Sequence, residues 1–206
     1  MGSGILYTDA REAAIVTHHI DQVRDRDQLI ACLAGGLAAK YLFFWGHTPP
    51  RDGSVGKACF SQWWHTGFHL DGVHYRTAEH WMMAQKAVLF GDEHHLQRIL
   101  EAGHPRDAKM LGRKVAGFDQ HTWEAACFDI VVRGNVAKFT QNAAEGAFLL
   151  GTGHRVLVEA SPQDRIWGIG LSERDEAAGH PETWRGQNLL GFALMEVRAR
   201  LRSGVK

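Results

Sequence analysis

A glutamate and a lysine seven residues apart mark the stretch of this chain that is best suited to chemistry. Glu79 and Lys86 lie in the segment 75–90, YRTAEHWMMAQKAVLF, whose pattern predicts a helix starting at Thr77. Seven residues span about two turns of α-helix, so both side chains fall on one face. Two methionines lie between them on that face. This pattern is typical of an amphipathic surface helix, and it is equally compatible with the floor of an active site.

A second carboxylate, Asp164, lies in a predicted turn between Ser161-Pro162 and Trp167-Gly168. Glu79 would be the second residue of its helix, where the macrodipole favours the charged carboxylate, so we expect it to act as a base or to stabilise a cation. Two carboxylates near an amine could hydrolyse a glycosidic bond through an oxocarbenium-like transition state. Taken alone, Lys86 is also typical of a surface lysine whose stem covers apolar residues.

Composition narrows the class of protein. The 206 residues suffice for one well-packed domain, and 23 basic residues balance 23 acidic ones. Zero net charge gives no bulk attraction to nucleic acid or to an anionic membrane, although a local basic pocket stays possible. No apolar run approaches the length of a membrane span, and the N-terminus lacks a signal-peptide pattern. Three cysteines without a CxxC pair favour a reducing compartment. We therefore expect a cytoplasmic enzyme or binding module without a membrane partner.

The elements that must position these residues are predicted to be mostly helical. Phe68–Leu70 and Val73–Tyr75 flank Asp71-Gly72, which is a strong hairpin-turn signal and places His69 opposite His74. Helices and strands do not alternate regularly, which predicts an α+β fold: a single helix-rich domain with a small β-sheet or hairpin. The other predicted elements are helices at 27–40, 93–102, 122–139 and 188–202, a short helix or turn at 107–114, a turn at 146–150, and extended segments at 41–45, 156–158 and 166–169.

Several common cofactor and catalytic motifs are missing. The sequence has no GxGxxG, Walker A, HExxH or GxSxG motif. The pairs His69/His74 and His94/His95 lack a third ligand at suitable spacing, so we interpret them as surface residues and not as metal ligands. The sequence therefore predicts neither a cofactor nor a metal ion.

Around these residues the chain resembles the NADAR (YbiA-like) family of N-glycosidases. Seven motifs occur in family order over roughly residues 42–202. They are Thr77-Ala-Glu-His-Trp, Ala84-Gln-Lys86, Ala108-Lys-Met-Leu-Gly-Arg113, Lys138-Phe-Thr-Gln-Asn142, Leu157-Val-Glu-Ala-Ser-Pro-Gln-Asp164, Trp167-Gly-Ile-Gly170, and Gly186-Gln-Asn-Leu-Leu-Gly191 followed by Met195 and Arg198. Residues 1–40 look like an N-terminal extension to a domain spanning 41–206. The loop within 46–64 also looks longer than is usual in the family, and it could set substrate choice.

The resemblance implies cleavage of a C–N bond between a ribose and a base-like group. Two substrate classes follow from it: a phosphoribosylamino-pyrimidine of the riboflavin pathway, or ADP-ribose attached to guanine in nucleic acid. Zero net charge slightly favours the small metabolite. The third hypothesis is a non-catalytic module that binds ADP-ribose or another NAD derivative, and the joint presence of Glu79, Lys86 and Asp164 argues against it. The oligomeric state is left open.

The resemblance also assigns residue roles. Its functional carboxylates carry over onto Glu79 and Asp164, and its lysine carries over onto Lys86, which could form a Schiff base with the opened sugar if its amine is partly neutral. Asp164 could orient a water or a ribose hydroxyl. The further candidates bind substrate: Trp123 or Trp167 as an aromatic wall, Arg113 and Lys109 as phosphate contacts, and Phe44, Asn142 and Asn188.

Overall fold

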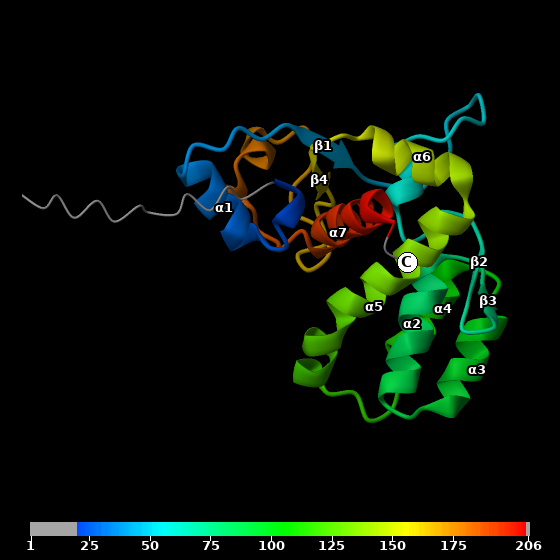
Figure 1. The fold of residues 1–206 in the computed structure, drawn as a ribbon. Coiled ribbons are helices and arrows are strands. Elements are labelled where there is room, and N and C mark those ends of the chain that lie inside the picture. The colour runs from blue at the N-terminus through cyan, green and yellow to red at the C-terminus, as the bar shows by residue number, and fades with distance from the viewer. Residues whose placement is uncertain (1–19, 205–206) are drawn as a thin grey trace, which may run out of the picture.

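Helices dominate the computed structural model, which describes residues 20–204 (Figure 1). The α-helices are α1 (Arg26–Ala34), α2 (Ala78–Leu89), α3 (Glu93–Glu101), α4 (Pro105–Gly112), α5 (Gln120–Gln141), α6 (Ala143–Gly151) and α7 (Leu189–Ser203). The strands are β1 (Tyr41–Phe44), β2 (Phe68–Leu70), β3 (Val73–Tyr75) and β4 (Val156–Glu159). Four short 3-10 helices complete the set: η1 (Ile20–Gln22), η2 (Lys57–Phe60), η3 (Glu176–Gly179) and η4 (Pro181–Thr183). The predicted α+β class is confirmed.

The strands form two separate two-stranded sheets. β1 and β4 pair in parallel, with Phe44 opposite Glu159. β2 and β3 form the predicted hairpin in the predicted register, including His69 opposite His74. At its turn Asp71 and Gly72 both have positive φ, 53° and 77°. That left-handed backbone is the conformation that an Asp-Gly turn favours, and it explains why the hairpin could be predicted from the sequence.

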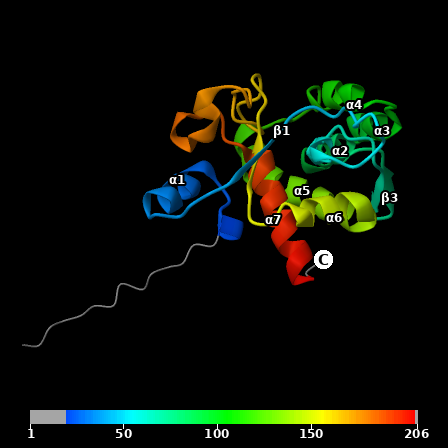
Figure 2. The same ribbon diagram turned by 90° about the horizontal axis from the view of Figure 1, so that it is seen from above.

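Helix α7 lies between two parts of the molecule (Figures 1 and 2). The first part contains α1 and the β1–β4 sheet, and the second contains α2, α3 and α4. Helix α7 packs on one side against β4 and on the other against α5. The second part is a group of helices, in which α2 contacts α3, α4 and α5 (Figure 1). The core of α7 includes Phe192, Leu194 and Met195, all fully buried. The chain segments on either side of α7 therefore share one hydrophobic core.

Helix α2 is a core helix and not the amphipathic surface helix that its pattern also allowed. Thr77 caps its N-terminus as predicted, with the hydroxyl accepting from the His80 N–H, and most of its residues are buried. Trp81 lies against Gly134 of α5, where an added Cβ would come within 2.2 Å of the indole ring. The Trp81 Nε1–H donates to the Ile130 carbonyl at 2.7 Å. Gly134 thus lets α5 pass close to α2 without ending the helix.

Three predicted elements were wrong. The turn predicted at 146–150 is part of helix α6. Residues 166–169 form no strand, because the Asp164 side chain folds them into a turn by accepting from the backbone N–H groups of Ile166 and Trp167. The first helix ends at Ala34 and not at residue 40. Gly36 follows with a φ of 90°, a conformation that glycine adopts readily and that stops the helix.

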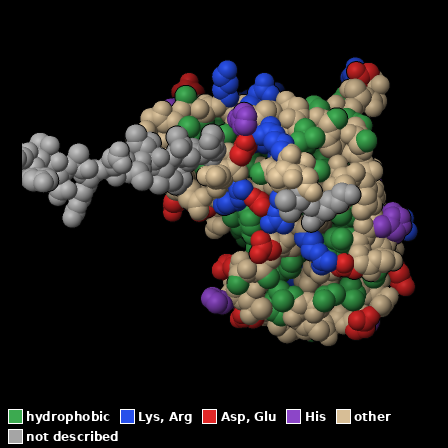
Figure 3. All heavy atoms as spheres, viewed as in Figure 1, with side chains coloured by type: hydrophobic (Ala, Val, Ile, Leu, Met, Phe, Trp, Pro, Cys, Tyr) green, Lys and Arg blue, Asp and Glu red, His purple; other side chains and the backbone are tan. Residues whose placement is uncertain are grey.

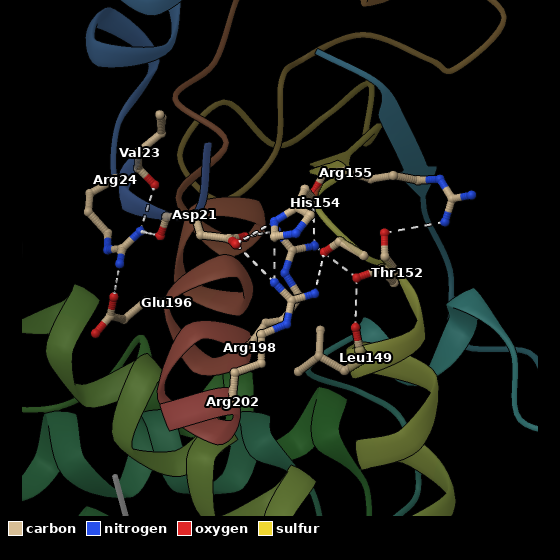
Figure 4. Close-up of polar contacts among 11 residues, drawn as sticks. Asp21, Val23, Arg24, Leu149, Thr152, His154, Arg155, Glu196, Arg198 and Arg202 are labelled. Atoms are coloured by element: carbon tan, nitrogen blue, oxygen red, sulfur yellow. Dashed lines mark hydrogen bonds and ion pairs between the residues drawn. The ribbon is translucent and has the colours of Figure 1, made fainter. Parts of the chain in front are cut away.

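The described part of the predicted N-terminal extension, residues 20–40, packs into the same core through buried side chains such as Leu29. An ionic cluster ties η1 to α7 (Figure 4). The Asp21 carboxylate accepts from Arg198 and Arg202, each at 2.9 Å, and lies 2.6 Å from His154 Nδ1. We call these four residues the Asp21–Arg198 clamp. The predicted extension's first 19 residues lie outside the described range.

The surface carries charges of both signs. On the face shown in Figure 3, Lys and Arg side chains are interspersed with Asp and Glu side chains, as the zero net charge leads one to expect. Within residues 20–204, no helix combines the length and the apolar character needed to cross a membrane.

Candidate active site

A cavity of about 700 Å³ gathers most of the residues that the sequence singled out. Glu79 and Lys86 from α2 open into it together, with Asp164 from the segment after β4. Two further strips of the wall come from the loop before the hairpin and from α4. The lining residues are Ser61, Gln62, Trp63, Glu79, Met82, Met83, Lys86, Lys109, Gly112, Arg113, Trp123, Glu159, Ser161, Gln163, Asp164, Arg165, Ile166, Trp167 and Leu190.

Buried polar side chains of α5 hold the loop that carries Trp63. The Lys138 ammonium donates to the carbonyls of Cys59 and Ser61 at 2.7 and 3.0 Å. Asn135 exchanges side-chain hydrogen bonds with Gln62. Gln62 in turn accepts from the backbone N–H of Glu79 at 2.9 Å. The loop that looked longer than the family's is therefore fixed to the first turn of α2, and it forms one wall of the cavity.

Glu79 is buried, with 2% of its surface exposed, and its Oε1 has no hydrogen-bond partner. Burial raises the pKa of Glu79 to about 7, although the Lys109 charge and the Trp63 indole pull it back down. The expectation that the helix N-terminus would keep this carboxylate ionised was incomplete, because desolvation outweighs the macrodipole here. Near neutral pH, Glu79 is able both to hold a proton and to carry a charge.

Glu159 is a second carboxyl group, on a partly buried residue, that sequence reasoning missed. It is the last residue of β4, it lines the cavity, and its Oε2 has no partner. Burial raises the pKa of Glu159 to about 8, and the neighbouring Asp164 charge adds to the effect. A signal was present in the sequence, since Glu159 directly follows a predicted strand and precedes a turn, but nothing local revealed its burial.

Asp164 has a structural task as well as a place in the cavity. Its Oδ1 accepts from the Ile166 and Trp167 N–H groups at 2.9 and 2.8 Å. These bonds fix the turn that brings Trp167 into the cavity wall. Asp164 therefore orients an aromatic ring, and it adds negative charge beside the two glutamates.

Lys86 lies among aromatic rings. Its Nζ is 3.9 Å from the centroid of the Phe118 ring and 5.5 Å from that of Trp123. Partial burial lowers the pKa of this amine below its ordinary value. A desolvated lysine of this kind is closer to the neutral form that attacks a carbonyl or an anomeric carbon.

Two cations that could hold a phosphate come from the region of α4. Lys109 lies on the helix, with its Nζ 5.9 Å from the centroid of the Trp63 ring, and Arg113 follows the last helical residue. Both line the cavity, and Arg113 is exposed to solvent. An arginine at the edge can bind a phosphate through two parallel hydrogen bonds.

Three of the proposed substrate-binding residues lie outside the cavity lining. Phe44 is buried with its ring centroid 5.4 Å from that of Phe60. The Asn142 amide donates to the carbonyls of Gly67 and Lys138. Asn188 is buried, donates to the Leu157 carbonyl and accepts from the Glu159 N–H. Their contacts are thus within the protein, and Asn188 acts on the site only by fixing the backbone of Glu159.

The histidine pairs of the sequence do not form a metal centre. His69 and His74 face each other across the hairpin with ring centroids 4.8 Å apart. Within residues 20–204, no group of three His, Cys, Asp or Glu side chains is arranged to hold a metal ion. The three cysteines are free and buried.

Comparison with known proteins identifies the family and the fold of this chain. The model of the NADAR domain matches residues 43–202. The chain belongs to the NADAR family. It is 44% identical to N-glycosidase R617 of Acanthamoeba polyphaga mimivirus over 77% of this chain and 95% of the relative. It is 34% identical to N-glycosidase YbiA of Escherichia coli over 64% of this chain and 74% of that protein.

The NMR structure of E. coli YbiA has the same fold, with a TM-score of 0.63 and 27% identity over 82% of this chain and 89% of YbiA. Together with the named NADAR relatives, this fold match makes the chain an enzyme of the N-glycosidase class.

Proposed function

We propose that this N-glycosidase hydrolyses the C–N bond between a ribose and a base-like group in a phosphoribosylamino-pyrimidine, an intermediate of the riboflavin pathway. One observation carries the proposal. Carboxyl groups, an amine, cations and aromatic rings line a single cavity, which is large enough for a small nucleotide-like molecule. Lys109 and Arg113 suit the 5-phosphate, the carboxyl groups suit the anomeric centre, and Trp123 or Trp167 suits the pyrimidine.

In this proposal the reacting bond lies next to Glu79. Breaking the C–N bond leaves positive charge on the anomeric carbon and its ring oxygen, and an ionised carboxylate in a buried site stabilises that charge strongly. The electron pair of the bond leaves with the nitrogen, which must gain a proton. Water then adds to the anomeric carbon and loses a proton to a carboxylate. Asp164 lines the same cavity and could orient that water or a ribose hydroxyl.

A covalent variant uses Lys86 as the nucleophile. Partial burial lowers the pKa of Lys86 and favours the neutral amine, although the Phe118 and Trp123 rings attract the cation. The neutral amine could attack the anomeric carbon, the base would leave with the electron pair of the C–N bond, and the opened sugar would stay on Lys86 as a Schiff base until water releases it. Borohydride added during turnover should then trap a substrate-dependent adduct on Lys86, located by peptide mass spectrometry. Lys57→Arg, at an exposed lysine paired with Glu173, is the matched control. An absent adduct, or near-full activity of Lys86→Arg, would exclude the covalent route.

ADP-ribose attached to guanine in nucleic acid is the second candidate substrate. The cavity lining includes Arg113, Arg165 and Ile166, which are all exposed to solvent. The cavity therefore reaches the surface, where a guanine still attached to a polymer could enter. Exposed arginines beside it suit the pyrophosphate or the nucleic-acid backbone.

One comparison of substrates separates these proposals. The protein is incubated with a phosphoribosylamino-pyrimidine and, separately, with DNA bearing ADP-ribosylated guanine, and the release of ribose 5-phosphate or of ADP-ribose is followed. We expect turnover of the small metabolite to be the faster. Preference for the DNA would support the second candidate instead. Activity on neither, combined with tight binding of ADP-ribose, would support a non-catalytic binding module.

A further inference from the structure

Buried polar atoms without partners are concentrated in the cavity. Among residues 20–204, three buried side-chain polar atoms make no hydrogen bond: Glu79 Oε1, Glu159 Oε2 and Arg198 Nε. The first two are carboxyl oxygens that line the same cavity. An unpaired buried polar atom costs about 1–3 kcal/mol, so natural proteins seldom keep one without a use. Both carboxyl groups therefore have an oxygen free to bind a group of the substrate in this cavity.

The backbone of Glu159 is fixed on both sides, while its carboxyl group stays free. Its N–H donates to Asn188 Oδ1 at 2.9 Å, and its carbonyl accepts from Ser161 and Ile169, each at 2.9 Å. In the sheet it lies opposite the buried Phe44. A side chain on a backbone held this firmly is positioned for a reaction, and the backbone needs little reorganisation when substrate binds.

Burial and the charges that face Glu159 favour the protonated form of its carboxyl group. Burial is the main reason that its pKa rises to about 8, and the charges of Asp164 and Glu79 add to it. Only Lys109 opposes the shift among the groups that influence it. Glu79 is the more easily ionised of the two glutamates, because the Lys109 charge and the Trp63 indole both oppose the effect of its burial, whereas the Asp164 charge adds to that of Glu159. Two carboxyl groups with separated pKa values divide the acid and the charge-stabilising roles between them.

We propose that Glu159 is a catalytic residue, the general acid that protonates the departing nitrogen of the substrate; the inference rests on the proposed C–N bond hydrolysis. The O–H bond of Glu159 breaks and an N–H bond forms while the C–N bond breaks, and its electron pair stays on nitrogen. Water then bonds to the anomeric carbon, and the proton that it loses restores the carboxyl group. Ionised Glu79 stabilises the cation in between.

The test compares two leaving groups in Glu159→Gln. An amine-linked pyrimidine needs a proton to leave, whereas 4-nitrophenolate leaves unprotonated, so the substrates are the phosphoribosylamino-pyrimidine and 4-nitrophenyl ribofuranoside 5-phosphate. We expect kcat to fall by about 10²–10⁴-fold on the first and by less than about tenfold on the second. In the wild type, kcat/KM should also fall above pH 8, where Glu159 loses its proton. This alkaline limb of the pH profile should be missing from the variant. Equal losses on both substrates, or an unchanged alkaline limb, would overturn the proposal.

Three further variants serve as controls for the Glu159→Gln experiment. Glu173→Gln removes an exposed glutamate outside the cavity, and it should react like the wild type with both substrates. Glu79→Gln should slow both substrates, because both pass through the same cation. Glu159→Asp keeps an acid and should retain the alkaline limb at reduced rate, even if Glu159→Gln proves unstable; loss of that limb would count against the role. Wild-type protein inactive on both substrates would instead overturn the proposed function on which the inference depends.

Discussion

The Asp21–Arg198 clamp and the cavity bury charged groups in opposite ways. In the clamp, Arg198 has no exposed side-chain surface, and its Nη1 and Nη2 groups donate to Asp21, to the Thr152 hydroxyl and to the Arg155 carbonyl, while its Nε has no partner (Figure 4). In the cavity, Glu79 and Glu159 each keep a buried carboxyl oxygen without any partner. The clamp therefore joins η1 to α7, while the cavity leaves its charged groups for a ligand.

The difference shows how one fold assigns charges to structure or to chemistry. A buried ion pair with its hydrogen bonds made is costly to break but has little left to offer a substrate. A buried carboxyl group without a hydrogen-bond partner lowers the stability of the free protein, and it gains its partner only when substrate binds. Burial alone therefore does not mark a catalytic residue; a buried carboxyl oxygen that has no partner and belongs to a residue lining the cavity does.

The largest expected effect tests the cavity side of this comparison. Glu79→Gln should lower kcat/KM for the ribosylamine by about 10²–10⁴-fold, because the amide cannot carry the charge that stabilises the anomeric cation. Release of ribose 5-phosphate measures the loss, and the melting temperature at pH 8 should not fall. A variant that stays fully active would remove Glu79 from the reaction.

The next effect tests the clamp. Arg198→Met should lower the free energy of unfolding by about 3 kcal/mol, because it leaves Asp21 without its main buried partner. Urea denaturation measures this loss. Activity per folded molecule at 20 °C should stay within about twofold of wild type, since Arg198 does not line the cavity. A large loss of activity without loss of stability would mean that the clamp also acts on the site.

The pH dependence of stability should have opposite signs in the two regions. Because the pKa of Glu79 is raised from 4.5 to about 7, its neutral form is favoured by folding, and the advantage is lost as the pH rises. Glu79→Gln should therefore gain about 1–3 kcal/mol over wild type between pH 4.5 and 7, and hold that gain above pH 7.

Asp21 shows the reverse dependence. Although burial opposes it, the charge of Arg198 lowers the Asp21 pKa below its ordinary 3.8. Its stabilising contribution is therefore present above pH 3.8 and lost as the pH falls below that value. Denaturation of wild type, Glu79→Gln and Asp21→Asn at each pH separates the two dependences; parallel curves for the two variants would contradict the comparison.

The smallest expected effect concerns an exposed ion pair, which serves as a reference for the buried clamp. Lys57 and Glu173 form an ion pair at 2.8 Å in which both side chains are about half exposed. Glu173→Gln should change the free energy of unfolding by less than about 0.5 kcal/mol, because solvent screens the pair. The same denaturation measurement applies, and a change as large as that of Arg198→Met would show that burial is not what separates the clamp from the surface.

Local chemistry explains which parts of the fold could be predicted. The Asp71-Gly72 turn sets the hairpin register, and Thr77 caps α2, because both depend on residues adjacent in sequence. The segment 166–169 was mistaken for a strand because its backbone N–H groups bond to Asp164 and not to a partner strand. The β-strand propensity of these residues does not distinguish between the two sets of hydrogen bonds.

For the candidate site, the sequence by itself determined the types and the order of Glu79, Lys86 and Asp164, and it placed the first two on one helix face. Tertiary structure decided that they share a cavity with Lys109 and Trp167, and that Phe44, Asn142 and Asn188 do not line it. It also decided the ionisation of Glu79 and Glu159. Desolvation depends on what packs around a side chain from distant parts of the chain, and no local pattern of residues records it.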